Sequence, residues 1–185
     1  MLETAVRYSH TLLREVITHG DTVVDATMGN GNDTCFLAEL VGKNGCVHAF
    51  DVQKLAIENT EKRLGERNLT ALLHWEGHEN VRKYLNMDLK AAIFNLGYLP
   101  KSDKAVITLP ETTLQALDSL LDNLLPNGRI VLVVYYGHDG GENEKEQVVE
   151  FTRSLPQEKF RVLQYQFINQ RNNPPFVLCI EKNEP

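Results

Sequence analysis

The segment Thr22-Val-Val-Asp-Ala-Thr-Met-Gly-Asn-Gly-Asn-Asp-Thr34 decides the fold of this chain of 185 residues. Four residues typical of a short buried strand lead into a glycine turn, and a helix is expected to follow over 33–43. Gly29 and Gly31 allow the backbone to turn tightly and to approach a ligand closely. Ligands of open parallel sheets bind at the carboxyl ends of the strands, so we expect a binding site at this turn.

Strands and helices alternate from this segment toward both ends of the chain. The strands are expected at 22–25, 46–52, 69–75, 90–95, 129–136, 160–169 and 176–182, and the helices at 2–19, 33–43, 53–67, 79–86, 109–125 and 142–155. Because the linker 170–175 is too short for a helical crossover, the last two strands are expected to be antiparallel neighbours. The pattern predicts an α/β fold with a doubly wound sheet. We expect residues 1–185 to form one domain, with the N-terminal helix as a cap.

The composition is that of a soluble globular protein, because hydrophobic residues make up 42% of the chain and charged residues 24%. No apolar run approaches the roughly 20 residues that span a bilayer. Residues 1–19 lack the uninterrupted apolar core of a secretion signal, so we expect a cytoplasmic protein without a membrane partner. The net charge of −6 disfavours a protein that coats nucleic acid by charge alone, although it leaves room for a local basic face.

The three cysteines, Cys35, Cys46 and Cys179, are far apart in the sequence and lie among apolar residues. A zinc site needs ligands paired at short spacing, and a disulfide framework normally uses an even number of cysteines. We therefore expect buried, reduced thiols and no metal site.

A carboxylate follows the second expected strand. Asp51 comes twenty residues after Gly31, and in this place it can accept hydrogen bonds from both hydroxyls of a ribose. The dinucleotide fingerprint would put a third glycine at Thr34, and Asp33 would repel a pyrophosphate at the helix start. A cofactor without phosphate suits this turn better, and S-adenosylmethionine brings an ammonium group that acidic and amide side chains bind. His78, after the third strand, either contacts the adenosine or only starts a helix.

The fourth expected strand runs out into Asn95-Leu-Gly-Tyr98, which resembles the Asn-Pro-Pro-Tyr tetrapeptide of amino-group methyltransferases. In that setting the asparagine oxygen and the next backbone carbonyl accept hydrogen bonds from a substrate amine, and the aromatic ring forms a wall beside the methyl group. Methyl transfer needs alignment of nucleophile, methyl and sulfur more than it needs acid–base catalysis. The alternative interpretation is a β-turn that uses Asn and Gly as turn formers.

Segments spread over the whole chain resemble one family. They are 25–34, 50–53, 78–80, 95–100, 136–142 and 169–176. The family consists of small bacterial methyltransferases, named rRNA methylases, which methylate the amine of 5-aminomethyl-2-thiouridine at the tRNA wobble position. The resemblance implies a Rossmann-like class I fold with seven strands in the order 3-2-1-4-5-7-6, an antiparallel last strand, and S-adenosyl-L-methionine as methyl donor. Asn32 departs from the family, in which many members have histidine.

The resemblance also implies roles for individual residues. Carried over by position, Asn30, Asp51, Gln53 and His78 should hold the cofactor, and Asn95, Leu96 (through its carbonyl) and Tyr98 should lie near the methyl group. Together with the glycine turn, the set expected to bind the cofactor is Asp25, Thr27, Met28, Gly29, Asn30, Gly31, Asn32, Asp33, Asp51, Gln53, Gly77, His78, Asn95 and Leu96.

His138, after the fifth expected strand, is a candidate general base, because an alkylammonium must lose a proton before it attacks and histidine titrates near neutrality. A nearby sulfonium charge would itself lower the pKa of the amine, and then no base is needed. In that case His138 contacts the substrate or only shapes the loop. The residues expected to be catalytic are Asn95, Tyr98 and His138.

An RNA substrate needs a positively charged surface, and a net charge of −6 does not supply one by itself. Residues 159–171 hold three basic residues and no acidic one, so RNA is expected near the loop 170–175, with bases against aromatic or amide groups. An ordinary solvated surface is the alternative. The residues expected to contact the substrate, the anticodon arm of a tRNA, are Arg7, Tyr8, His10, Gly97, Tyr136, Asn169, Arg171 and Asn172. The resemblance makes a homodimer possible.

Other functions are compatible with the same cofactor-binding residues. An rRNA or small-molecule methyltransferase is the first alternative, and a sensor that binds an adenosyl ligand without chemistry is the second. The Asn95–Tyr98 segment argues against the sensor, which has no need of an amine-binding edge. A reduced-nicotinamide enzyme is a weaker alternative, which separate titrations of adenosylhomocysteine and NAD would distinguish.

Overall fold

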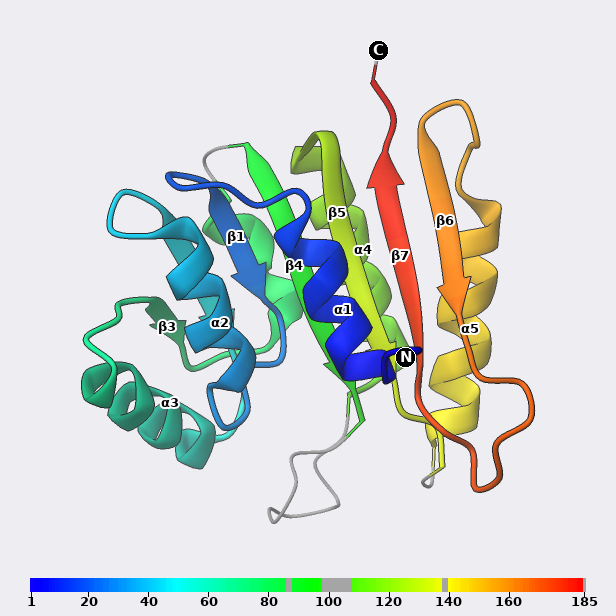
Figure 1. The fold of residues 1–185 in the computed structure, drawn as a ribbon, viewed down its shortest axis with the longest axis horizontal. Coiled ribbons are helices and arrows are strands. Elements are labelled where there is room, and N and C mark those ends of the chain that lie inside the picture. Colours follow the sequence, from blue (N-terminus) through cyan, green and yellow to red (C-terminus); the bar gives the residue numbers. More distant parts are fainter. Residues whose placement is uncertain (86–87, 98–107, 138–139, 185) are drawn as a thin grey trace.

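Seven strands of the described residues form one sheet in the order β3-β2-β1-β4-β5-β7-β6 (Figure 1). The structure is a computed structural model, and it describes residues 1–85, 88–97, 108–137 and 140–184. The strands are β1 (Thr22–Asp25), β2 (Cys46–Phe50), β3 (Leu72–His74), β4 (Leu89–Leu96), β5 (Leu124–Val134), β6 (Phe160–Tyr165) and β7 (Phe176–Lys182). This order confirms the predicted doubly wound α/β sheet.

Strand direction places the functional edge of the sheet. Strands β1 to β5 pair in parallel, whereas β7 runs antiparallel to both β5 and β6. The closing antiparallel hairpin predicted from the short linker is therefore confirmed. The carboxyl ends of β1, β2, β4 and β5 all meet at one edge, the lower edge in Figure 1.

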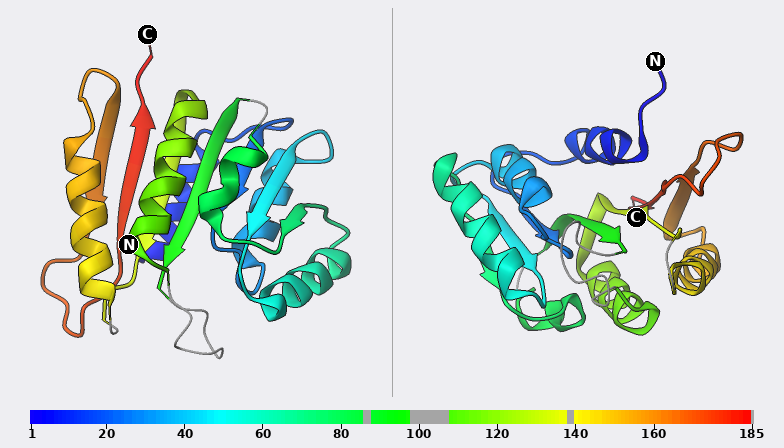
Figure 2. Two further views of the ribbon diagram at one scale, coloured as in Figure 1. Left: turned by 180° about the vertical axis from the view of Figure 1, so that it is seen from behind. Right: turned by 90° about the horizontal axis from the view of Figure 1, so that it is seen from below.

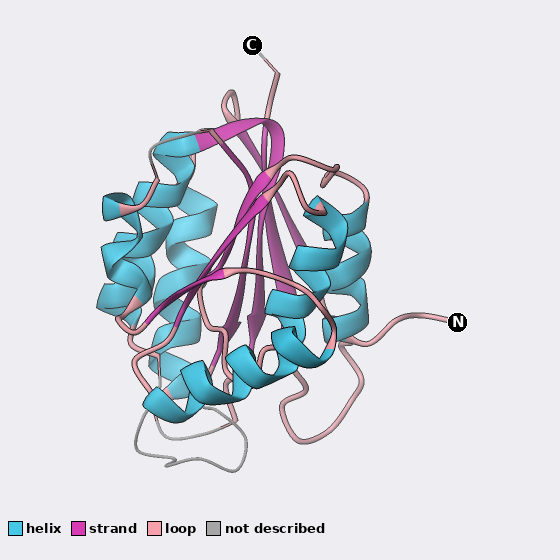
Figure 3. Ribbon diagram, turned by 90° about the vertical axis from the view of Figure 1, so that its left-hand side faces the viewer, coloured by secondary structure: helices cyan, strands magenta, loops and turns pink. Residues whose placement is uncertain are grey.

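Helices cover both faces of the sheet (Figures 2 and 3). The helices are α1 (Ala5–Arg14), α2 (Asn32–Val41), α3 (Lys54–Glu66), the 3-10 helix η1 (His78–Lys83), α4 (Pro110–Asn123) and α5 (Gly141–Ser154). α1 and α2 pack on one face, and α4, α5 and η1 pack on the other. Within the described ranges, none of the helices has the length and apolar character that crossing a membrane requires.

Strand β4 is buried on both faces, which explains its nearly continuous apolar sequence. Ala91 and Ile93 belong to the core under α1 and α2, whereas Ala92 and Phe94 belong to the core under α4. Full burial of a side chain the size of Ile93 or Phe94 contributes about 1.5–3 kcal/mol. The strand is thus held firmly where its last residues enter the site.

The first helix is shorter than the range 2–19 predicted from its apolar spacing. Thr4 is its N-cap, so the three residues before it lie outside the helix. Beyond its end at Arg14, the Asp21 carboxylate accepts a hydrogen bond from the backbone N–H of Thr18 at 2.7 Å. Such local side-chain bonds compete with helical hydrogen bonds.

Five of the seven strands have boundaries that differ from the predicted ranges, and the two largest differences are in β5 and β6. β5 begins at Leu124 and not at Arg129, so it includes the turn-forming residues 126–128, with Asn127 at a positive φ of 56°. β6 ends at Tyr165 and does not continue to Asn169. Apolar periodicity alone did not reveal that β5 keeps pairing with β4 on both sides of the turn residues.

Candidate active site

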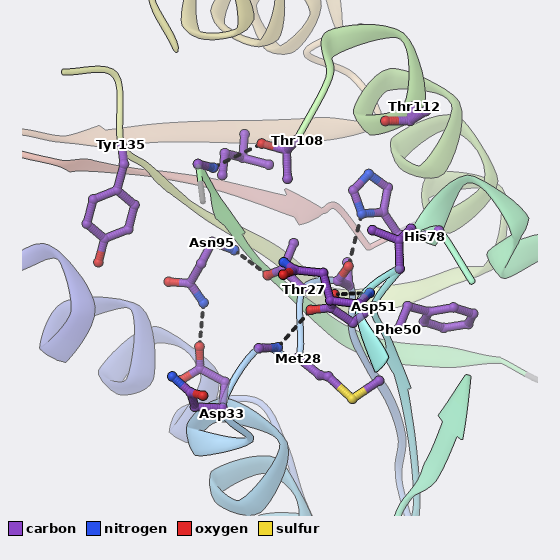
Figure 4. Close-up of a pocket in the computed structure, with 18 of the residues that line it drawn as sticks. Thr27, Met28, Asp33, Phe50, Asp51, His78, Asn95, Thr108, Thr112 and Tyr135 are labelled. Carbon is purple, nitrogen blue, oxygen red and sulfur yellow. Dashed lines mark hydrogen bonds between the residues drawn. The ribbon is translucent and has the colours of Figure 1, made fainter. Parts of the chain in front are cut away.

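A cavity of about 740 Å³ opens at the carboxyl ends of β1, β2 and β4, beside the glycine turn (Figure 4). The turn after β1 forms its floor, and residues after β2, β3, β4 and β5 form its walls. This is the edge where parallel α/β sheets bind their ligands.

The glycine turn is held in place by backbone contacts. Gly29 and Gly31 have φ angles of 50° and 76°, in the left-handed region that favours glycine. A Cβ on Gly31 would lie 2.9 Å from the Cα of Thr60, so only glycine allows α3 to approach this closely. The backbone N–H of Met28 donates to the carbonyl of Phe50 at 3.0 Å, which ties the turn to the end of β2.

Asp25 holds the glycine turn through two hydrogen bonds. It is fully buried, and its carboxylate accepts the Thr34 hydroxyl at 2.6 Å and the Thr27 backbone N–H at 3.2 Å. Burial, together with the neighbouring charge of Asp33, raises the pKa of Asp25 to about 7. Asp25 and Gly31, both expected to bind the cofactor, do not line the cavity; they shape the turn that does.

Asp51, just after β2, bridges the glycine turn and the start of α3. One carboxylate oxygen accepts the Gly29 N–H at 3.0 Å, and the other accepts the Gln53 N–H at 2.9 Å. Burial raises the pKa of Asp51, while these two bonds lower it. Each oxygen keeps further acceptor capacity toward the cavity, which suits a pair of vicinal hydroxyls.

His78 offers a buried acceptor. Its Nδ1 lies 2.9 Å from the carbonyl of Ala26, which can only accept, so Nδ1 carries the proton and Nε2 is the acceptor. Burial lowers the pKa of His78, which keeps the ring neutral. Nε2 has no hydrogen-bond partner among the described residues. A buried polar atom without a partner beside a cavity fits a ligand that donates to it.

Asn95 lies at the end of β4, beside the first turn of α2. Its backbone N–H donates to the Thr27 hydroxyl at 2.7 Å, and its Nδ2 donates to the Asp33 carboxylate at 2.5 Å. The second oxygen of Asp33 lies 2.6 Å from Nε2 of His10 on α1. The three side chains thus join β4, α2 and α1 at the cavity.

The backbone groups of the two residues after Asn95 already make hydrogen bonds within the protein. The Leu96 carbonyl accepts the Tyr135 N–H at 3.1 Å, which continues the pairing of β4 with β5. The Gly97 N–H donates to the Thr108 hydroxyl at 2.9 Å, and the Gly97 carbonyl accepts the Thr108 N–H at 3.0 Å. The carbonyl expected to accept from a substrate amine is therefore part of the sheet, with only its second lone pair left for a ligand.

The cavity has an acidic lining. Asp33, Asp51 and Glu79 are among its described lining residues, which include neither lysine nor arginine. A pyrophosphate would meet only repulsion from these charges, whereas a cationic ligand would be attracted.

Comparison with known proteins decides the family. The family model described as "Putative rRNA methylase" matches residues 47–181. The chain belongs to this family. Its sheet is that of the class I S-adenosylmethionine-dependent methyltransferases, with the same Rossmann-like layers.

Individual relatives match almost the whole length of this chain. A chloroplastic tRNA (mnm(5)s(2)U34)-methyltransferase of Arabidopsis thaliana is 38% identical over 192 residues, covering 96% of this chain and 69% of the relative. The crystal structure of a "putative rRNA-methylase" from Clostridium thermocellum is 49% identical, covers 98% of this chain and 99% of its own, and has a TM-score of 0.97. A "putative methyltransferase" from Streptococcus mutans in complex with SAH is 44% identical, with coverage of 98% and 99% and a TM-score of 0.91.

In this methylase most residues expected to bind the cofactor lie together. Those that line the cavity are Thr27, Met28, Gly29, Asn30, Asn32, Asp33, Asp51, Gln53, Gly77, His78, Asn95 and Leu96. Of the expected substrate residues, Gly97 also lines it. His10 reaches its edge through Asp33.

Other expected substrate residues lie elsewhere. The ring of Tyr136 packs against Phe176 and under the Lys145 ammonium, so it faces α5, and Tyr135 lines the cavity in its place. The ring of Tyr8 packs against Tyr165 with centroids 4.2 Å apart and planes tilted by 32°. The residues of this group that are exposed at the surface are Arg7, Asn169, Arg171 and Asn172. Tyr98 and His138, both expected to be catalytic, lie outside the described residues.

Several lining residues were missed by the sequence analysis. They are Val6, Ala26, Phe50, Val52, Glu79, Thr108, Leu109, Thr112 and Tyr135. A signal existed for Phe50, Val52 and Tyr135, because they adjoin Asp51 or end an apolar strand. Thr108 and Val6 reach the site only through tertiary packing, which the sequence pattern does not encode.

Proposed function

We propose that this methylase transfers a methyl group to the amine of 5-aminomethyl-2-thiouridine at the wobble position of tRNA. The observation that carries the proposal is the 38% identity, over 96% of the chain, to a tRNA (mnm(5)s(2)U34)-methyltransferase. The geometry supports an amine acceptor, because Asn95 stands at the end of β4 in an acidic cavity.

The methyl donor is S-adenosyl-L-methionine, and the described residues fit it. When bound, this cofactor supplies a methyl group on a positively charged sulfur. Asp51 is placed to accept the ribose hydroxyls, and His78 offers its buried Nε2 to a donor such as an adenine amino group. Asp51 and Glu79 in the lining favour the positive charges of the cofactor and disfavour NAD, whereas the Asp33 carboxylate is engaged by His10 and Asn95.

Catalysis by these residues consists mainly of positioning. The amine attacks through its lone pair, so it must be neutral when the nitrogen–carbon bond forms and the carbon–sulfur bond breaks. The methylated nitrogen then releases a proton. The Asn95 side-chain oxygen holds the amine by accepting a hydrogen bond from one of its N–H groups. The phenol of Tyr135 lies across the cavity as a neutral wall, since burial and the charge of Asp33 raise the pKa of Tyr135.

We further propose that the anticodon arm lies along the exposed loop 166–175, which carries Arg171. A net charge of −6 leaves little basic surface in one copy, and a homodimer would supply more. Light scattering of the pure protein tests the dimer: a mass of one chain at assay concentration contradicts it.

An rRNA substrate is the second candidate, and the description of the family model favours it. Transfer of labelled methyl to separated tRNA and rRNA, both from cells that lack this gene, distinguishes the two. We expect label in tRNA, located at the wobble uridine. Label in rRNA alone would keep the chemistry and overturn the proposed substrate.

A further inference from the structure

The carboxylate of Asp33 is shared between two side chains from distant parts of the chain. One oxygen lies 2.6 Å from Nε2 of His10, and the other lies 2.5 Å from Nδ2 of Asn95. The Asp33 side chain is 12% exposed, so water competes little for these contacts. Each oxygen thus has its own fixed partner.

This arrangement determines which end of the Asn95 amide faces the cavity. An ionised carboxylate only accepts hydrogen bonds, so the group that meets Asp33 must be the NH₂ of Asn95. The amide oxygen then points the other way, and in Figure 4 it lies on the side of Tyr135. Without Asp33, the amide could rotate and present either end.

We propose that Asp33 is a positioning residue that sets the Asn95 amide so that its oxygen meets the substrate. The inference rests on the proposed function and deepens it. An oxygen selects a nucleophile that carries a hydrogen to donate, as a primary amine does, and fixes the nitrogen for in-line attack.

His10 holds the second oxygen of the Asp33 carboxylate. Its ring stacks on Phe36 with centroids 3.9 Å apart and planes 8° from parallel, and the guanidinium of Arg14 lies 4.8 Å from the centre of the same Phe36 ring. The histidine ring is therefore held from both α1 and α2. By occupying one oxygen of Asp33, it leaves the other for Asn95.

A purely structural role predicts something different. An aspartate in the first turn of a helix stabilises the helix by interaction with its dipole. In that case removal of Asp33 would lower the stability and act independently of Asn95. A direct contact with the cofactor, as expected from the sequence, would instead lower cofactor affinity.

A double-mutant cycle separates these roles. We expect Asp33→Ala, which removes the acceptor of the Asn95 amide, to lower the single-turnover rate about 10- to 100-fold, with adenosylhomocysteine affinity within about twofold of wild type. Asn95→Ala should lose at least as much, and the double variant should be no slower than Asn95→Ala alone. Additive losses, or a large loss of adenosylhomocysteine affinity in Asp33→Ala, would overturn the proposal. His10→Ala, a milder change for folding, should give a smaller loss of the same kind.

A second readout needs no RNA. The side-chain amide signals of Asn95, identified by their absence in Asn95→Ala, should move in ¹H–¹⁵N spectra of Asp33→Ala and exchange with water faster. Unchanged signals would contradict the inference even if methyl transfer falls. If wild type methylates no tRNA but these signals do move, the proposed function fails and the role of Asp33 stands.

Discussion

The Thr108 hydroxyl donates a hydrogen bond to the Glu144 carboxylate over 2.6 Å, and the same hydroxyl accepts the N–H of Gly97. Glu144 is buried in the first turn of α5, and its other oxygen accepts the Thr113 hydroxyl at 2.8 Å. One buried carboxylate thus fixes the backbone just after Asn95 to two helices. The end of β4 is therefore held by Glu144 on the side of α4 and α5 and by Asp33 on the side of α1 and α2.

Glu144→Ala should therefore destabilise the fold by about 2–3 kcal/mol, because the buried Thr113 hydroxyl loses its acceptor. Methyl transfer should fall as well, since Gly97 loses its anchor. Urea unfolding measures the first effect. Glu150→Ala, an exposed position on the same helix, is the control and should stay within about 0.5 kcal/mol of wild type. Equal effects of the two substitutions would contradict the role given to Glu144.

Gly31→Ala should destabilise the protein by about 2 kcal/mol or more, because it adds a Cβ in a left-handed conformation and against Thr60. Gly65 in α3 has open space around it and an ordinary φ, so Gly65→Ala should stabilise by about 0.5–1 kcal/mol. Urea midpoints of both variants test the pair. A harmless Gly31→Ala would show that α3 and the turn are not in close contact.

Asp51→Ala should weaken adenosylhomocysteine binding about 10- to 100-fold, since it removes the carboxylate that faces the cavity and frees the Gly29 N–H. Calorimetric titration measures the affinity. The exposed Glu61 on α3 provides a matched control, and Glu61→Ala should bind as wild type does. An unaltered affinity in Asp51→Ala would move the ribose site elsewhere.

Asp25 should make stability fall as the pH rises. Its pKa is about 7 in the folded protein, raised by burial, against an ordinary value of 3.8. The folded state therefore holds a proton that the unfolded state has lost between about pH 4 and 7, and the loss of stability is at most about 1.4 kcal/mol per pH unit. Asp25→Asn carries no such proton. Urea unfolding from pH 5 to 8 should show wild type weakening relative to Asp25→Asn up to about pH 7; parallel curves would refute this.

Arg171→Ala should raise the Michaelis constant for tRNA and leave adenosylhomocysteine affinity unchanged, because Arg171 lies in the exposed loop after β6, outside the cavity. Arg153→Ala, which removes an exposed arginine from α5, is the control and should change neither quantity. Damage to both quantities in Arg171→Ala would indicate a folding role.

Local sequence patterns predicted the elements that carry strong periodicity. The buried β4 and the turn at Gly29 are encoded by a nearly continuous apolar run and by glycine, so the sheet edge and the acid Asp51 were found from sequence. The order of strands came from the resemblance, since periodicity does not say which strands are neighbours.

Contacts between distant residues were not predictable. Asp33 meets His10 and Asn95 only because α1 folds back over the sheet. Tyr135 rather than Tyr136 lines the cavity, because the ring of Tyr136 packs against Phe176 and Lys145. From the sequence, Tyr136 was named as a substrate contact and Tyr135 was missed. The same limit applies to Asp25, whose acidic side chain resembles a ligand contact but lies beneath the turn.

The most direct test of the account uses a defined acceptor. An anticodon stem-loop with 5-aminomethyl-2-thiouridine at the wobble position is incubated with the enzyme and S-adenosyl-L-methionine, beside the same stem-loop with 2-thiouridine there, and both are analysed by nucleoside mass spectrometry. The account predicts one methyl group on the aminomethyl nitrogen of the first stem-loop and none on the second. No methylation of the first stem-loop by enzyme that binds adenosylhomocysteine and methylates rRNA would contradict it.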